Sequence, residues 1–182
     1  MGWTSTHRAQ GAKDRDWWQE ELGRHRTIVA CATVKGTFYA AVKNDDTVSH
    51  APGKTWGLII LQRWSPKSDY NFSYKEMDET SGPYYYDAPA AVLDALSPTE
   101  NPLSLVWRNE CRKKLAARAK RPRISKGDTV KFEKPIKFTS GAELDTFTFV
   151  GRNIFSADGR RYRIGNWHET PYTVVSRADR AA

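Results

Sequence analysis

Half of the residues between positions 108 and 123, RNECRKKLAARAKRPR, are Lys or Arg, and Glu110 is the single acid among them. This basic segment has a net charge of +7, whereas the rest of the chain contributes only about +1 of the total of +8. Concentrated cations attract polyanions better than the same charge spread evenly over a surface. Each Lys or Arg that contacts a phosphate releases counterions, and Arg can also donate two parallel hydrogen bonds to phosphate oxygens.

The basic segment therefore predicts a surface for nucleic acid. Its candidate binding residues are Arg108, Arg112, Lys113, Lys114, Arg118, Lys120, Arg121 and Arg123. The competing interpretation is a solvated helix face whose charges pair with Asp and Glu elsewhere in the chain. An acidic host protein or a ribonucleoprotein would fit the same charges, so the partner stays open between these classes.

A second group of chemically able residues lies in the block SYKEMDETSGP. Paired carboxylates can hold a divalent metal ion or divide into an acid and a base, and metal-dependent nucleases place such carboxylates near a Lys. Asp78, Glu79 and Lys75 are therefore the residues of an alternative, enzymatic hypothesis: a metal-dependent nuclease or a nucleotide-processing enzyme. The alternative to that is a structured turn in which the carboxylates accept hydrogen bonds from backbone amides.

Three consecutive tyrosines, Tyr84, Tyr85 and Tyr86, cannot all face the core, so at least one should be exposed and available to stack on a base. The four histidines show no metal-ligand spacing, and Cys31 and Cys111 form no paired motif. We expect no catalytic residue outside the alternative above, no metal and no cofactor. We expect reduced thiols, and the sequence has no apolar run of membrane length and no signal-peptide core. We therefore expect a cytoplasmic protein without membrane association.

The elements that would position these residues can be read from the first two thirds of the chain. DRDWWQEELG predicts a short helix started by Asp14 or Asp16, and residues 26–43 predict two strands joined by a turn at Lys35–Gly36. Residues 55–64 predict a central strand buried on both faces, and residues 69–79 begin as another strand. DAPAAVLDALSP predicts a short helix capped by Asp87, and residues 101–120 predict the longest helix. Its apolar stripe would be Leu103, Trp107, Cys111, Leu115 and Ala119.

Beyond Pro122 the pattern changes to short alternating runs between turn signals, with Asp158–Gly159 as a strong hairpin signal. Five or six strands in about fifty residues favour a small barrel. The opening Gly-Asp-x-Val pattern at residue 127 favours an SH3-like one by analogy. The prediction is thus an α+β chain of two domains. Residues 1–121 form a mostly antiparallel sheet with two to three helices and end in the basic helix, and residues 122–182 form a small SH3-like β-barrel with a frayed tail.

Several blocks together resemble one family: GWTSTHR at residue 2, FSYKEMDETSGP at residue 72, PAAVLDALSP, WRNECRKKL, and VKFEKPIKFTSGAELDTF at residue 130. It is an uncharacterised family of bacterial proteins from phages, plasmids and other mobile elements, known only as a domain of unknown function. The resemblance carries no activity across. It implies a context in which accessory proteins maintain DNA, control genes or counter host defence.

The leading hypothesis from the sequence is a non-enzymatic accessory protein of a mobile element that binds nucleic acid or a ribonucleoprotein through the basic helix. In this hypothesis its role is that of a counter-defence factor, directed against CRISPR or restriction. The metal-dependent enzyme at Asp78 and Glu79 is the first alternative, and a structural protein-interaction module is the second. The sequence leaves the oligomeric state, the choice between DNA, RNA and protein, and any reaction open.

Overall fold

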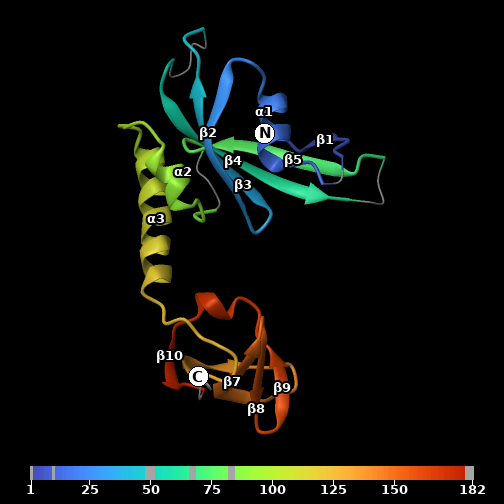
Figure 1. Cartoon of the computed structure of the whole chain (residues 1–182), viewed down its shortest axis with the longest axis vertical. Helices are drawn as coiled ribbons and strands as arrows, with labels where there is room; N and C mark the ends of the chain where they lie inside the picture. The colour runs from blue at the N-terminus through green and yellow to red at the C-terminus, as the bar shows by residue number, and fades with distance from the viewer. Residues whose placement is uncertain (1, 10, 48–51, 66–68, 82–84, 179–182) are drawn as a thin grey trace. The chain divides into compact units, whose positions relative to one another are not determined.

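The computed structural model describes residues 2–9, 11–47, 52–65, 69–81 and 85–178. The chain divides into two compact units, residues 1–119 and residues 120–182. Both are drawn in Figure 1, the first in blue to yellow and the second in orange and red. The basic segment contributes its first twelve residues to the first unit and its last four to the second.

The first unit is built on a five-stranded antiparallel sheet in the order β1-β5-β4-β3-β2. Its strands are β1 (Thr4–Thr6), β2 (Arg26–Val34), β3 (Thr37–Asn44), β4 (Thr55–Trp64) and β5 (Phe72–Asp78). The turn between β2 and β3 is made by Lys35 and Gly36, both at positive φ, as expected for a tight hairpin. β4 has the predicted bounds and is the central strand, as its apolar sequence on both faces indicated.

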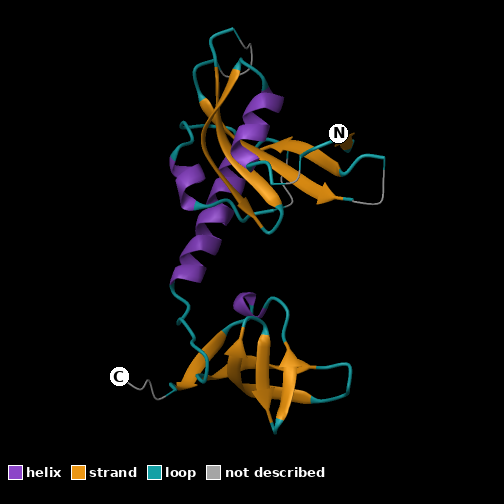
Figure 2. Ribbon diagram, turned by 45° about the vertical axis from the view of Figure 1, so that its right-hand side comes forward, coloured by secondary structure: helices purple, strands orange, loops and turns teal. Residues whose placement is uncertain are grey.

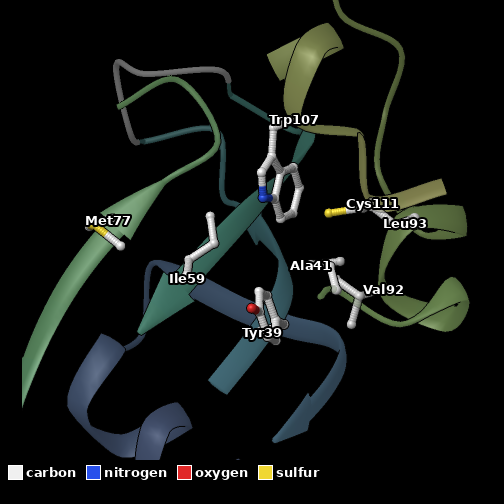
Figure 3. Close-up of a cluster of buried hydrophobic side chains, with 9 residues drawn as sticks. Tyr39, Ala41, Ile59, Met77, Val92, Leu93, Trp107 and Cys111 are labelled. Atoms are coloured by element: carbon white, nitrogen blue, oxygen red, sulfur yellow. The ribbon is translucent and has the colours of Figure 1, made fainter. Parts of the chain in front are cut away.

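Helices cover both faces of this sheet (Figure 2). α1 (Asp14–Leu22) packs Trp18 on one face, against Phe38, Ile60 and Phe72. α2 (Ala90–Asp94) and α3 (Pro102–Ala119) cover the other face. Figure 3 shows that cluster, in which Trp107 and Cys111 of α3 meet β-sheet residues including Tyr39 and Ile59, beside Val92 and Leu93 of α2.

Four local predictions for this unit are corrected by the structure. β1 was not foreseen, because Thr4–Thr6 has no apolar alternation, yet it pairs with β5. The N-cap of α1 is Lys13 without a side-chain cap bond, and that of α2 is Pro89 rather than Asp87. On α3, Leu103 is half exposed while Ser104 is buried, so the buried stripe begins one residue later than the apolar spacing indicated.

The second unit is a five-stranded antiparallel sheet in the order β10-β6-β7-β8-β9. Its strands are β6 (Thr129–Lys137), β7 (Glu143–Gly151), β8 (Ile154–Ala157), β9 (Arg160–Arg163) and β10 (Tyr172–Ser176), with a 3-10 turn η1 (Trp167–Glu169) before the last strand. Asp158 and Gly159 form the predicted hairpin turn, both at positive φ. Val130, Phe132, Phe147 and Phe155 form its buried core.

The α+β class with two antiparallel sheets and few helices is confirmed. Strand pairing in the described part of the second unit runs from β10 to β9 without a pairing between those two end strands. A closed barrel is therefore not established, and the SH3-like barrel stays a prediction.

Candidate nucleic-acid interface

The basic helix α3 is fixed to the first unit by its cap and its buried stripe. Asn101 Oδ1 accepts hydrogen bonds from the backbone N–H groups of Leu103 and Ser104, at 3.0 and 3.1 Å, which satisfies two of the otherwise free donors of the first turn. Trp107 is fully buried, and its indole N–H donates to the Tyr85 carbonyl at 3.0 Å. Most of the cations of α3 therefore lie on the flanks and the outer face of the helix.

Arg108 is not one of the outward cations. Its guanidinium forms a bidentate ion pair with Glu79, with Nε to Oε2 at 2.6 Å and Nη2 to Oε1 at 2.7 Å, and it also donates to the Ser97 carbonyl at 2.7 Å. The side chains are only 13% and 4% exposed. Glu79 also accepts the N–H of Gly57 at 3.1 Å. The pair ties α3 to β4 and the end of β5, so Arg108 has little freedom to contact a phosphate.

Arg112 and Lys113 form ion pairs that remain open to water. Arg112 lies 3.0 Å from Asp94 with side chains 53% and 62% exposed, and Lys113 lies 2.6 Å from Glu110 with side chains 73% and 40% exposed. Such exposed pairs contribute only about 0–1 kcal/mol each. A phosphate could replace either carboxylate at little cost, so these two cations stay available.

Asp87 is the acidic partner of the cations on the following turns of α3. Arg118 lies 2.7 Å and Lys114 3.8 Å from one of its oxygens, and Lys35 of the β2–β3 turn lies 3.9 Å from the other. Lys114 also lies over the Tyr86 ring, 5.6 Å from its centroid. Asp87 is separated from these helix residues by more than two dozen positions, so no local sequence pattern predicts that it pairs with them.

The last four residues of the basic segment belong to the second unit and have different surroundings. Lys120 and Arg123 are exposed. The Arg121 guanidinium donates to the Glu169 carbonyl at 3.2 Å, and its other Nη is buried without a hydrogen-bond partner among the described atoms. No ion pair to any of these three cations occurs within the described residues. The Tyr172 hydroxyl donates to the Pro122 carbonyl at 2.6 Å, which holds the stretch beside β10.

The two units differ in net charge. Residues 120–182 contain 13 Lys and Arg against 7 Asp and Glu, a net charge of +6, whereas residues 1–119 contain 16 against 14, a net charge of +2. The acids Glu79, Asp87 and Asp94 balance much of α3. The excess positive charge of the protein therefore lies mainly in the second unit.

The alternative catalytic residues do not converge. Met77 of β5 faces the α3 side of the sheet, and successive strand residues alternate, so Asp78 faces the opposite side and Glu79 returns to α3. Asp78 accepts hydrogen bonds from the Thr80 N–H at 2.7 Å and from the Thr80 and Ser81 hydroxyls. Desolvation raises the pKa of Asp78, but these hydrogen bonds outweigh it and hold the pKa below its ordinary value.

Lys75 precedes them on β5, opposite Leu61, and belongs with Met77 to the α3 side. Within the described residues, no group of three or more His, Cys, Asp or Glu side chains is arranged to hold a metal ion.

A cleft of about 620 Å³ lies where α3 begins, and Glu79 and Arg108 contribute to its lining together with Lys54, Ser104 and Thr55. Its one buried carboxylate is already neutralised by Arg108 and bonded to a backbone N–H. The buried carboxylate of the cleft is therefore not free to act as a general base.

Of the candidate stacking residues, Tyr84 lies outside the described residues. Tyr85 is 46% exposed, and Tyr86 packs against the core cluster beneath α3. Of the two described tyrosines of the run, Tyr85 is therefore the exposed one, and stacking on a base stays a prediction for it.

A family model described as a domain of unknown function (DUF6927) matches residues 98–167, which comprise α3, the whole basic segment and the second unit as far as Trp167. The match agrees with the resemblance to an uncharacterised family and names no activity. No curated protein and no solved structure gives a significant match to the chain. In the described part of the chain, none of the helices is both long and apolar enough to cross a membrane.

Proposed function

We propose that the chain is a non-enzymatic protein that binds nucleic acid through the basic segment 108–123. The observation that carries this proposal is the set of cations at its end, Lys120, Arg121 and Arg123, which have no carboxylate partner among the described residues and belong to a unit of net charge +6. Unpaired cations of this density neutralise phosphates and release counterions.

In the helical part of the segment, two of the five cations are available for direct phosphate contacts. Arg112 and Lys113 hold only exposed ion pairs, which a phosphate can displace. Lys114 and Arg118 share Asp87, whose side chain is only 13% exposed, and Arg108 is held by Glu79. These three cations therefore contribute to the electrostatic potential around the helix more than to direct contacts.

We also infer, from the resemblance of the motifs alone, an accessory role on a phage or plasmid in which nucleic-acid binding counters CRISPR or restriction systems. A net charge of +8 suits a protein that grasps nucleic acid rather than an acidic one that imitates it. An SH3-like barrel in the second unit belongs to the same proposal. Its support is a strand order in which the last strand pairs with the first, with η1 immediately before that last strand.

The test is binding of the purified protein to labelled duplex DNA, single-stranded DNA and RNA across a salt series. In the segment variant, Arg112, Lys113, Lys120 and Arg123 are each replaced by Gln. These four are exposed, so the substitutions should leave stability within about 0.5 kcal/mol. If all four contact a duplex, the slope of log K against log salt should shrink by about 3.6, at about 0.9 per contact.

The matched control removes the same charge from exposed positions of the first unit: Lys13, Arg24, Lys43 and Arg63, each replaced by Gln. We expect the control to keep nearly the wild-type slope. Equal losses in both variants would mean that net charge alone drives binding. Failure of the wild type to bind any of the three polymers at low salt would overturn the proposal and direct the search to an acidic protein partner.

The enzymatic alternative has less support. Asp78 is engaged in turn hydrogen bonds and Glu79 in a buried ion pair, on opposite sides of the sheet. A structural interaction module would be favoured instead if a stoichiometric protein partner copurified and no polymer bound.

A further inference from the structure

We infer a second nucleic-acid contact surface on the outer face of the β8–β9 hairpin and the adjoining β7–β8 turn of the second unit, formed by Arg152, Arg161 and Arg163. This inference rests on the proposed function for its class of ligand and goes beyond it in location, because none of these residues lies in the basic segment. All three side chains are exposed, and within the described part of the unit none forms an ion pair.

The core of the unit fixes the direction of two of these arginines. Phe155 of β8 is fully buried and pairs across the ladder with Tyr162, whose ring packs 4.5 Å from Phe138. Because neighbours along a strand face opposite sides, Arg161 and Arg163 project from the outer face, about 6.7 Å apart.

The residues opposite Arg161 and Arg163 are Ser156 and Ile154, so no acid faces either arginine across the ladder. Between Arg152 and Arg163 the single acid is Asp158 in the turn, which leaves this stretch with a net charge of +3.

Hydrogen bonds connect this face to the end of the basic segment. The Trp167 indole N–H donates to the Arg152 carbonyl at 3.1 Å, and two residues later the Glu169 carbonyl accepts from Arg121 at 3.2 Å. Arg121 and Arg152 therefore flank the same short turn, η1, which is the small purple helix of the second unit in Figure 2.

From Arg152 the surface continues onto β9. The N–H of Ile164 donates to the Asn153 carbonyl at 2.9 Å, which places Arg163 beside the turn that holds Arg152. The acid along this path is Glu169, with His168 Nε2 3.8 Å from its carboxylate. A phosphate backbone bound at residues 120–123 can thus continue over η1 to Arg152 and the arginines of β9.

Edge strands also carry charges merely to prevent sheet-to-sheet pairing, and β9 is an edge strand. That role needs charges of either sign and no continuity with another cationic site. Here the hairpin cations are all Arg, the residue best suited to phosphate oxygens, and they adjoin the unpaired end of the basic segment. These two features favour nucleic acid as the occupant over simple protection of the edge.

The experiment compares two full-length variants of equal charge in the same salt series on duplex DNA and on single-stranded RNA. In the hairpin variant, Arg161 and Arg163 of the hairpin and Arg152 of the adjoining turn are replaced by Gln. In the control, Lys131, Lys134 and Lys137 of β6, a strand that pairs with β7 and β10, are replaced by Gln. If all three arginines contact phosphates, the duplex salt slope should shrink by about 2.7, against a change below about 0.9 for the β6 variant.

The outcomes separate this inference from the proposed function. If the wild type binds, the segment variant is impaired and the hairpin variant matches wild type, the hairpin inference is wrong and the proposed function stands. If the hairpin and β6 variants lose slope equally, net charge explains the effect and the hairpin is no specific surface. If the wild type does not bind, the proposed function fails and takes this inference with it. Circular dichroism at matched temperatures verifies that the edge strand is retained in each variant.

Discussion

Replacing Arg108 by Ala should unfold the first unit more easily without weakening phosphate contacts. The substitution removes two hydrogen bonds to Glu79 and one to the Ser97 carbonyl and leaves a carboxylate that is only 4% exposed without its cation. Removing one partner of a buried ion pair costs about 3–5 kcal/mol. Because Arg108 is 13% exposed and borders the cleft, where water can partly solvate Glu79, we expect the lower end, about 3 kcal/mol.

Urea denaturation followed by tryptophan fluorescence measures this loss, because six of the seven tryptophans, including the buried Trp107, belong to the first unit. With a slope of about 2 kcal/mol per molar urea, the midpoint should fall by about 1.5 M. Arg112→Ala, one helical turn away, is the matched control: its pair is more than half exposed, so its cost should be about 0–1 kcal/mol.

A double-mutant cycle with Glu79→Ala sharpens the test. The combined loss should fall short of the sum of the single losses by about 1–3 kcal/mol, because removing both charges leaves neither unpaired. The reasoning is refuted if Arg108→Ala costs less than about 1 kcal/mol, if the two losses add, or if the variant keeps wild-type stability while its salt slope for DNA falls by about one unit.

Three further outcomes follow from the packing and the titrating groups. Gly57→Ala should destabilise the first unit by about 1–3 kcal/mol in urea, because a Cβ there would lie 2.9 Å from the Trp107 ring. Hydrogen bonds from backbone N–H groups and the Arg177 guanidinium hold the pKa of Asp128 below its ordinary value. The ionised carboxylate therefore adds to the free energy of unfolding. This contribution is complete above the unfolded-state pKa and is lost as pH falls through the lower folded-state pKa. Asp128→Asn should therefore flatten the acid dependence of the stability of the second unit, measured by NMR on its residues, and an unchanged dependence would contradict this. Burial raises the pKa of the Cys111 thiol to about 11, so iodoacetamide should label it only after unfolding, as mass spectrometry can show.

Much of the scaffold could be predicted because its signals are local. The apolar run within residues 55–64, the Lys35–Gly36 turn and the Asp158–Gly159 turn each specify an element within a few residues, and each occurs where expected. β1 could not be predicted in this way, since Thr4–Thr6 is a strand only through its pairing with β5, some seventy positions later. On α3, Trp107 and Cys111 are buried as predicted, but the first stripe position is Ser104 and not Leu103, because four-residue spacing alone does not decide between them.

The electrostatics of the candidate site was less predictable than its location. A window of sixteen residues reveals where cations are dense, but the free energy of each cation depends on acids that folding brings beside it. Glu79 is 29 positions from Arg108, and Asp87 is 31 positions from Arg118, so neither pairing has a local signature.

The cations of the protein differ in whether folding places a carboxylate beside them, and this difference decides where a polyanion would bind most strongly. A cation already paired with a buried acid gains little from a phosphate, because the new contact must offset the acid left behind. A cation without such an acid gains the full counterion release. Affinity and salt dependence should therefore concentrate in the second unit, at Lys120, Arg123 and the β9 arginines. α3 would then contribute its positive electrostatic potential and two exposed ion pairs, those of Arg112 and Lys113, whose carboxylates a phosphate can displace. The buried pair of Arg108 holds the helix in place.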